Sequence, residues 1–187
     1  MMKIRIKFRK YGTMKFIGHL DVMRYFQKAI RRSEVNIRYS EGFSPHQIMS
    51  FAAPLGVGIT SKGEYVDIEV LDTENSKKMI DRLNAVMSEG FEILEYKLLP
   101  DDAANAMSIV AAADYSLVFR PGYEPEKESP EEWFEKLVRF FDADHVMIMK
   151  KTKKGEREMD LKPFVYELNV RKNGEVPALF MKVSAGS

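Results

Sequence analysis

The chain has 187 residues, 45% of them hydrophobic and 30% charged, so it can bury one large core or two small ones. It contains no cysteine, which excludes structural disulfides, thiolate zinc sites and cysteine-ligated iron–sulfur clusters within it and favours a reducing compartment. The longest apolar runs have the length of strands, and the first ten residues alternate charge with hydrophobe, unlike a signal peptide or a membrane span. We therefore expect a cytoplasmic protein without a membrane segment.

The net charge of +1 hides an uneven distribution of charge along the chain. Residues 1–48 contain eleven Lys and Arg against three Asp and Glu, a local charge of +8 with histidine neutral. A segment this basic is typical of a surface for nucleic acid or for an acidic protein. It also arises where two oppositely charged segments pair inside one fold. Both interpretations stay open at this point.

Segments with the periodicity of strands and helices follow one another along the first hundred residues. In chain order they are a strand at 3–9, a helix at about 19–33, short strands near 35–39 and 47–51, a strand at 64–71, a helix at about 74–88 and a strand at 91–98. The resulting order, β-α-β-β-α-β, is that of the split ferredoxin-like unit, in which the first and third strands lie side by side. The basic outward positions of 3–9 would then face the acidic outward positions of 64–71 and be neutralised by them. This weakens the case for RNA binding by the first strand alone.

After a linker of small residues at 101–113 the pattern starts again. It predicts a strand at 115–120, a helix at 129–141 with Ser129 as its N-cap and Pro130 at its first position, and strands at 145–152, 164–172 and 178–185. We therefore predict an α+β fold of two ferredoxin-like halves in tandem, with domains at 1–100 and 114–187. The second half lacks its expected second helix, so we expect it to be incomplete, with a truncated C-terminus.

The helix at 19–33 is amphipathic. At about 100° per residue, its apolar side carries Val22, Met23, Phe26, Ala29 and Ile30, and its opposite side carries Arg24, Lys28, Arg31 and Arg32. Asp21 lies one turn before Arg24 and near the helix start, where the helix dipole favours a negative charge. The apolar side is predicted to be core. The basic side is either a solvated surface or a surface that faces phosphate or an acidic protein.

Two histidines lie in or near this helix. His19 falls on the apolar side of its first turn, a position more typical of a capping or packing residue than of a catalyst. His46 lies in the segment 39–47, where Gly42 and Pro45 shape a turn. Together with Asp21 and Glu41 the histidines could ligate a metal in principle, but their spacing does not favour it, so we expect no metal. The sequence contains no Ser-His-Asp pattern, P-loop or dinucleotide fingerprint, and we expect no cofactor.

Several short motifs stand close together in the first 70 residues. They are GHLD (18–21), AIRRSEV (29–35), YSEGFSPH (39–46), FAAPLGVG (51–58) and EYVDIEV (64–70). With these motifs the chain resembles the radical-SAM-linked domain family of unknown function, found in bacteria beside or fused to the C-terminus of radical SAM proteins. The resemblance implies an accessory protein that presents or positions a substrate for a radical SAM partner, many of which modify RNA or proteins. This chain has no cysteine with which to hold the radical SAM cluster itself.

Three functions are compatible with these features. In the first, the protein is a non-catalytic module that holds an RNA or another anionic substrate near its partner, with aromatic rings such as Phe43 and Phe51 as stacking surfaces. The candidate binding residues are Asp21, Arg24, Lys28, Arg31, Arg32, Tyr39, Glu41, Phe43, Ser44 and His46. In the second, His19 and His46 process RNA by metal-independent acid–base chemistry, which requires both imidazoles in one cleft. In the third, the basic helix docks onto an acidic protein as a pure adaptor. We favour the first.

Overall fold

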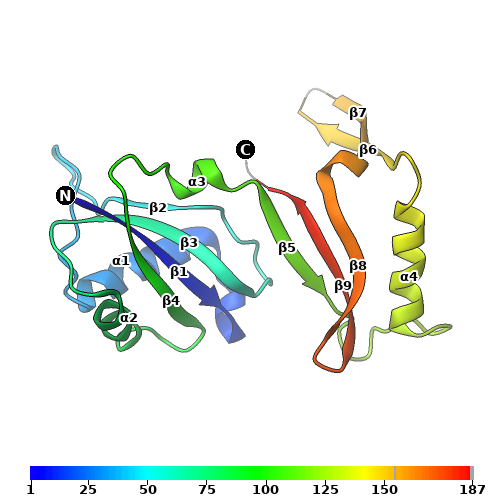
Figure 1. Cartoon of the computed structure of the whole chain (residues 1–187), viewed down its shortest axis with the longest axis horizontal. Coiled ribbons are helices and arrows are strands. Elements are labelled where there is room, and N and C mark those ends of the chain that lie inside the picture. The colour runs from blue at the N-terminus through cyan, green and yellow to red at the C-terminus, as the bar shows by residue number, and fades with distance from the viewer. Residues whose placement is uncertain (154, 186–187) are drawn as a thin grey trace. The chain divides into compact units, whose positions relative to one another are not determined.

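The computed structural model describes residues 1–153 and 155–185 and divides into two compact units, Met1–Val110 and Ala111–Ser187 (Figure 1). Both units combine helices with antiparallel sheets, so the predicted α+β class is confirmed. In the described part of the chain, no helix is both long enough and apolar enough to cross a membrane.

Unit 1 is built on one four-stranded sheet. Its elements are β1 (Met2–Lys10), the 3-10 helix η1 (Gly12–Phe16), α1 (His19–Arg32), β2 (Met49–Phe51), β3 (Ser61–Val70), α2 (Ser76–Asn84), β4 (Phe91–Leu99) and α3 (Ala106–Ile109). The strands lie in the order β2-β3-β1-β4, and every neighbouring pair is antiparallel. The predicted adjacency of the first strand and the strand at 64–71 is therefore confirmed.

The alternation of β1 and β3 separates a core face from a charged face. The core face carries Ile4, Ile6, Phe8, Val66, Ile68 and Val70, which pack with Val22, Phe26 and Ile30 of α1 and with Met79 and Leu83 of α2. Full burial of one such side chain is worth about 1.5–3 kcal/mol, so this face, covered by the two helices in Figure 1, stabilises the unit. It also fixes which side of α1 is turned to solvent.

The charged face of the sheet is largely neutralised within unit 1, as the alternation predicts. Arg5 forms a two-bonded ion pair with Asp67 of β3, at 2.8 and 2.9 Å. Lys7 pairs with Glu95 of β4 at 2.9 Å, and Arg9 pairs with Glu92 of the same strand. The partners of Lys7 and Arg9 thus come from β4 rather than from the predicted strand at 64–71.

The chain after β4 folds back onto this charged face. Lys3 Nζ donates to the carbonyl of Asp101, Arg5 Nη2 donates to the carbonyl of Ala104, and the backbone N–H of Ala106 donates to Asp67 at 2.7 Å. Ala106, the first residue of α3, is buried. Most of the segment expected to be a linker at 101–113 is therefore part of unit 1.

Unit 2 departs from the predicted second ferredoxin-like half. Its elements are β5 (Ala112–Leu117), α4 (Pro130–Phe141), β6 (Met147–Thr152), β7 (Gly155–Asp160), the 3-10 helix η2 (Lys162–Phe164), β8 (Val165–Asn173) and β9 (Val176–Ser184). Three strands form a sheet in the order β5-β9-β8, whereas β6 and β7 form a two-stranded hairpin. The strand predicted at 145–152 exists, but it pairs with β7 instead of joining the sheet. The tandem ferredoxin-like arrangement is therefore not confirmed.

The start of α4 agrees with the sequence in detail. Ser129 is the N-cap and Pro130 is the first helical residue. The hydroxyl of Ser129 accepts from the N–H of Glu132, and the Glu132 carboxylate accepts in return from the N–H of Ser129, which makes a complete capping box. Hydrogen bonds from Ser129 lower the pKa of Glu132.

Candidate functional site

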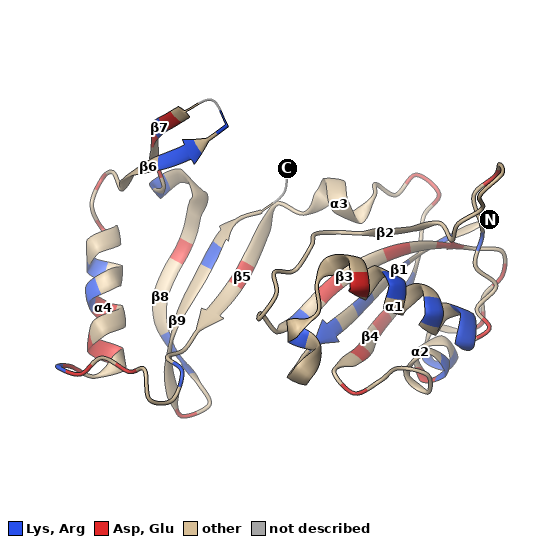
Figure 2. Ribbon diagram, turned by 180° about the vertical axis from the view of Figure 1, so that it is seen from behind, with Lys and Arg blue, Asp and Glu red and all other residues tan. Residues whose placement is uncertain are grey.

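The solvent side of α1 carries the predicted basic residues (Figure 2). Lys28 and Arg31 are exposed, and neither side chain makes an ion pair or hydrogen bond with any residue that the structure describes. Arg24 lies 3.4 Å from Asp21, and because both side chains are exposed, this pair is weak. Asp21 therefore offsets only part of the positive charge.

Arg32 differs from the other three basic residues. Its guanidinium donates to the carbonyl of Val86, beyond the end of α2, at 2.9 Å and lies 6.0 Å from the ring centre of Tyr25. This contact connects α1 to the chain that follows α2, so Arg32 has a structural role. We name Arg24, Lys28 and Arg31 the basic stripe. At 1.5 Å of rise per residue it runs about 10 Å along the helix.

The predicted loop at 39–47 is closed by its own hydrogen bonds. Ser40 Oγ lies 2.8 Å from Nδ1 of His46 and accepts from the His46 N–H, while the Ser40 N–H donates to the His46 carbonyl. His46 therefore closes the loop, and its imidazole is already engaged. Gly42 has a φ of 106°, a backbone conformation that residues other than glycine rarely adopt, and this allows the tight turn.

Closure of this loop turns the remaining candidates outward. Tyr39, Glu41, Phe43 and Ser44 are all exposed, and the Phe43 ring is completely so. Glu41 lies 4.0 Å from Arg38, a long ion pair, since Arg38 is held more closely by Glu69 at 2.8 Å. The loop thus presents an aromatic ring on a rigid turn.

Gln47 connects the loop to α1. Its side chain is only 4% exposed, and Nε2 donates to the carbonyl of Gln27 at 3.2 Å and lies 3.4 Å from the Tyr39 hydroxyl. Gln27 precedes Lys28 in the chain. Gln47 therefore attaches the C-terminal end of the loop to the backbone of α1.

His19 lies in different surroundings. Its ring packs edge-to-face against Phe51 at 5.4 Å and lines a narrow pocket whose polar residues are Lys10 and Glu64. Lys10 is 1% exposed and donates to the carbonyl of Ile17 at 2.8 Å; burial lowers the pKa of Lys10 and raises that of Glu64. No contact joins His19 to His46 among the described residues.

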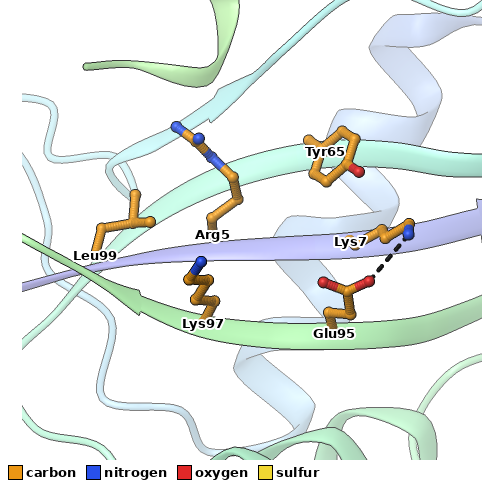
Figure 3. A pocket seen from close by; sticks show the side chains of 6 residues that line it. All are labelled: Arg5, Lys7, Tyr65, Glu95, Lys97 and Leu99. Carbon is orange, nitrogen blue, oxygen red and sulfur yellow. Dashed lines mark hydrogen bonds and ion pairs between the residues drawn. The ribbon is translucent and has the colours of Figure 1, made fainter. Parts of the chain in front are cut away.

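Sequence reasoning missed Lys10, Glu64 and one further cation, Lys97. Lys10 lies two residues after Phe8 and Glu64 lies two residues before Val66, so the alternation of their strands was the available signal that both turn toward the core. Lys97 lines a pocket on the charged face of the sheet with Arg5, Lys7, Tyr65, Glu95 and Leu99 (Figure 3). In β4, Lys97 follows the buried Tyr96 and therefore points outward, and this was the sequence signal that could have identified it.

A metal site has no support in the geometry. Within residues 1–153 and 155–185, no group of three or more His, Asp or Glu side chains is placed to hold a metal ion.

Comparison with known proteins gives a family but no function. The model of a family described as uncharacterised proteins conserved in bacteria, DUF2344, matches residues 3–187. No curated protein matches the chain.

Proposed function

Because this chain belongs to DUF2344, a bacterial family of uncharacterised proteins, we propose a function from the geometry of unit 1. The protein is a non-catalytic module that binds the phosphate backbone of RNA along the basic stripe. One observation carries this proposal: Lys28 and Arg31 point to solvent with no partner in the described part of the chain, whereas Arg5, Lys7 and Arg9 of β1 each have a carboxylate partner. Of the basic residues of β1 and α1, those without a partner among the described residues are therefore on the helix.

The form of this surface favours RNA over an acidic protein. Successive members of the stripe stand about 6 and 4.5 Å apart along the helix axis, so neighbouring phosphates of one strand can be contacted in turn. The loop that Gln47 attaches to α1 offers the exposed ring of Phe43, and a single-stranded RNA carries bases that stack on such a ring. An acidic peptide would use the charges but would leave Phe43 without a role.

We also infer that unit 1 is a split β-α-β unit of the ferredoxin-like type. The chain order β1-α1-β2-β3-α2-β4 and the sheet order β2-β3-β1-β4 support this inference. Catalysis by His19 and His46 draws no support from their contacts, since His46 closes its loop and His19 packs on Phe51.

We propose that the RNA is presented to a radical SAM protein, which would be the partner of this module. The support is the resemblance of the N-terminal motifs, three of which supply Asp21, Arg31 and the loop with Phe43. Native mass spectrometry of the purified chain mixed with a radical SAM protein encoded beside a member of this family should detect a stoichiometric complex. Two separate species at micromolar concentration would contradict the partnership.

The RNA proposal is tested by the salt dependence of binding. We expect the affinity of the protein for a fluorescently labelled RNA, measured by anisotropy, to fall steeply as salt is raised. The double variant Lys28→Ala, Arg31→Ala should bind more weakly and reduce the slope of log affinity against log salt by about 1.5. Arg32 is left in place because its bond to Val86 supports the fold.

The matched control is Lys77→Ala, Lys78→Ala on α2. Both lysines are exposed on a helix of the same unit, but they pair with Asp81 and Glu74. This variant should keep the affinity and the salt slope of the wild type. If both double variants lose the same amount of affinity, the effect is due to net charge and not to the basic stripe. Binding that does not depend on salt would overturn the proposal.

A further inference from the structure

The face of the unit 1 sheet opposite the helices holds a second candidate site. Side chains from three neighbouring strands line a cavity of about 170 Å³; they are Arg5, Lys7, Tyr65, Glu95, Lys97 and Leu99. Figure 3 shows these side chains standing on β3, β1 and β4 around the pocket. Because strands rather than loops carry them, their spacing is set by the sheet.

The charges of this pocket do not balance. Arg5 is neutralised by Asp67, and Lys7 is neutralised by Glu95 at 2.9 Å. Lys97 lies directly opposite Arg5 in the register of β1 and β4, an arrangement of like charges that destabilises a sheet. Among the residues that the structure describes, no carboxylate pairs with Lys97. The sheet thus holds one uncompensated cation beside the pocket.

An aromatic ring lies across β1 from this cation. Tyr65 is paired with Lys7 in the register of β1 and β3, and it remains 36% exposed. Tyr65 lies opposite Lys7 and Lys97 lies opposite Arg5, so with strands about 4.8 Å apart and a rise of about 3.3 Å per residue the two positions are about 12 Å apart on the sheet. Leu99 adds an apolar side chain on the same strand as Lys97. A ring, an apolar wall and a single cation suit a flat aromatic ligand that carries one negative group.

We propose that this pocket binds one unpaired nucleotide of an RNA strand, with the base against Tyr65 and the phosphate at Lys97. The inference rests on the proposed function in taking RNA as the ligand, but it uses the opposite face of the sheet from the basic stripe. An unpaired nucleotide is required because a duplex keeps its bases stacked inside, where Tyr65 cannot reach them. Base stacking on an aromatic residue does not depend on sequence, so the pocket distinguishes single-stranded from duplex RNA and not one base sequence from another.

The test compares single-stranded and duplex RNA of the same sequence on the full chain. An eight-nucleotide RNA is offered as a labelled single strand and as a duplex to the wild type, Tyr65→Leu and Lys97→Gln. We expect Tyr65→Leu to weaken single-strand binding about fivefold or more and to leave duplex binding unchanged. Lys97→Gln should reduce the salt slope of single-strand binding by about one. The thermal unfolding curve of each variant shows whether its fold is intact.

A control lysine lies on the same sheet. Lys62 of β3 is exposed but does not line the pocket, so Lys62→Gln should change neither measurement. If Tyr65→Leu and Lys97→Gln bind both the single strand and the duplex with the affinity of the wild type, the inference is wrong. Binding of adenosine monophosphate as tight as that of the oligonucleotide would also overturn it, in favour of a free-nucleotide site.

The two proposals fail in different ways. If Lys28→Ala, Arg31→Ala weakens duplex binding and the pocket variants behave as the wild type, the RNA proposal stands and the pocket inference is wrong. If the wild type binds neither form of RNA, both are wrong. Loss of single-strand binding in Tyr65→Leu together with loss of duplex binding in the stripe variant supports both surfaces.

Discussion

Asp67 holds together the charged face of the unit 1 sheet. Its carboxylate accepts two hydrogen bonds from Arg5 and a third from the backbone N–H of Ala106, and its side chain is only 16% exposed. Hydrogen bonds to a carboxylate are among the stronger ones in proteins, and removing one partner of a poorly solvated ion pair leaves the other charge uncompensated.

We therefore expect Asp67→Ala to lower the free energy of unfolding by about 2 kcal/mol or more, because Arg5 and the Ala106 N–H both lose their acceptor. Urea denaturation measures this loss. Glu95→Ala, which breaks the more exposed pair with Lys7, is the control and should cost less than about 1 kcal/mol. Equal costs for the two substitutions would contradict the argument.

At the scale of single residues, the sequence correctly predicted which way side chains point, but it did not predict which residues they pair with. The helical period correctly turned Arg24, Lys28 and Arg31 away from the core, and the period of two correctly turned Arg5 and Lys7 outward. It could not reveal that Lys7 pairs with β4, because a register shift between Lys7 and Phe8 decides which residues lie opposite. Nor could it reveal that Arg32 bonds a carbonyl 54 residues away. The partner of a side chain depends on contacts between distant parts of the chain, and the local periodicity carries no information about those contacts.

At the scale of elements, Asp160 joins the two ends of the β6–β7 hairpin. Asp160, the last residue of β7, lies 2.8 Å from Nδ1 of His145 and accepts from the backbone N–H groups of Val146 and Lys162. The hydrogen bond with His145, followed by the two backbone bonds, lowers the pKa of Asp160 from 3.8 to about 2. A two-stranded hairpin is marginally stable in water, so this anchor matters to it.

The lowered pKa predicts how the hairpin responds to acid. Because the folded-state pKa lies below the unfolded value, the contribution of Asp160 is fully present above 3.8 and is lost as the pH falls through about 2. The amide proton shifts of Val146 and Lys162, followed by NMR, should therefore titrate together with a midpoint near 2. Asp160→Asn should abolish this transition. A midpoint at the ordinary aspartate value would show that the three bonds do not form in solution.

The elements of unit 1 that bury one face were predictable from the sequence, whereas the strand β7 of unit 2 was not. The strand expected at 3–9 occupies Met2–Lys10, and the helix expected at 19–33 occupies His19–Arg32. By contrast, β7 reads GEREMD, and its exposed positions carry charges on both faces, so no alternation marks it as a strand. The strand expected at 35–39 is reduced to isolated bridges at Ile37 and Tyr39. Since the charged side chains of β7 do not alternate with apolar ones, the period of two could not identify this strand.

At the scale of the whole molecule, the division after Val110 falls within the segment 101–113 that was expected to be a linker, but most of this segment belongs to unit 1. Small residues such as those at 103–106 are typical of linkers, but they also allow close packing on a sheet, and here Ala106 is buried there. Composition alone does not separate the two uses, because the bonds of Arg5 and Asp67 to this segment come from distant strands.

This boundary predicts how the chain can be divided. A fragment of residues 1–110 should fold with a cooperative thermal transition, since it keeps the core of unit 1 and the bonds from the segment to β1 and β3. A fragment of residues 1–100 should melt lower, by about 4–8 °C for each kcal/mol lost. Circular dichroism measures both transitions. Identical melting temperatures would mean that the segment contributes nothing to the stability of unit 1.

The shortness of β2 has a consequence for the solubility of unit 1. An uncovered strand at the edge of a sheet has unpaired backbone N–H and C=O groups, which can pair with a strand of another molecule and so lead to aggregation. Here β2 spans only Met49–Phe51, yet the irregular chain around it also bonds the edge of β3, through Arg38 and Ile48 at Glu69 and through Ala52 at Tyr65. This covering segment occupies hydrogen-bonding groups of β3 that would otherwise be free to pair with a strand of another molecule.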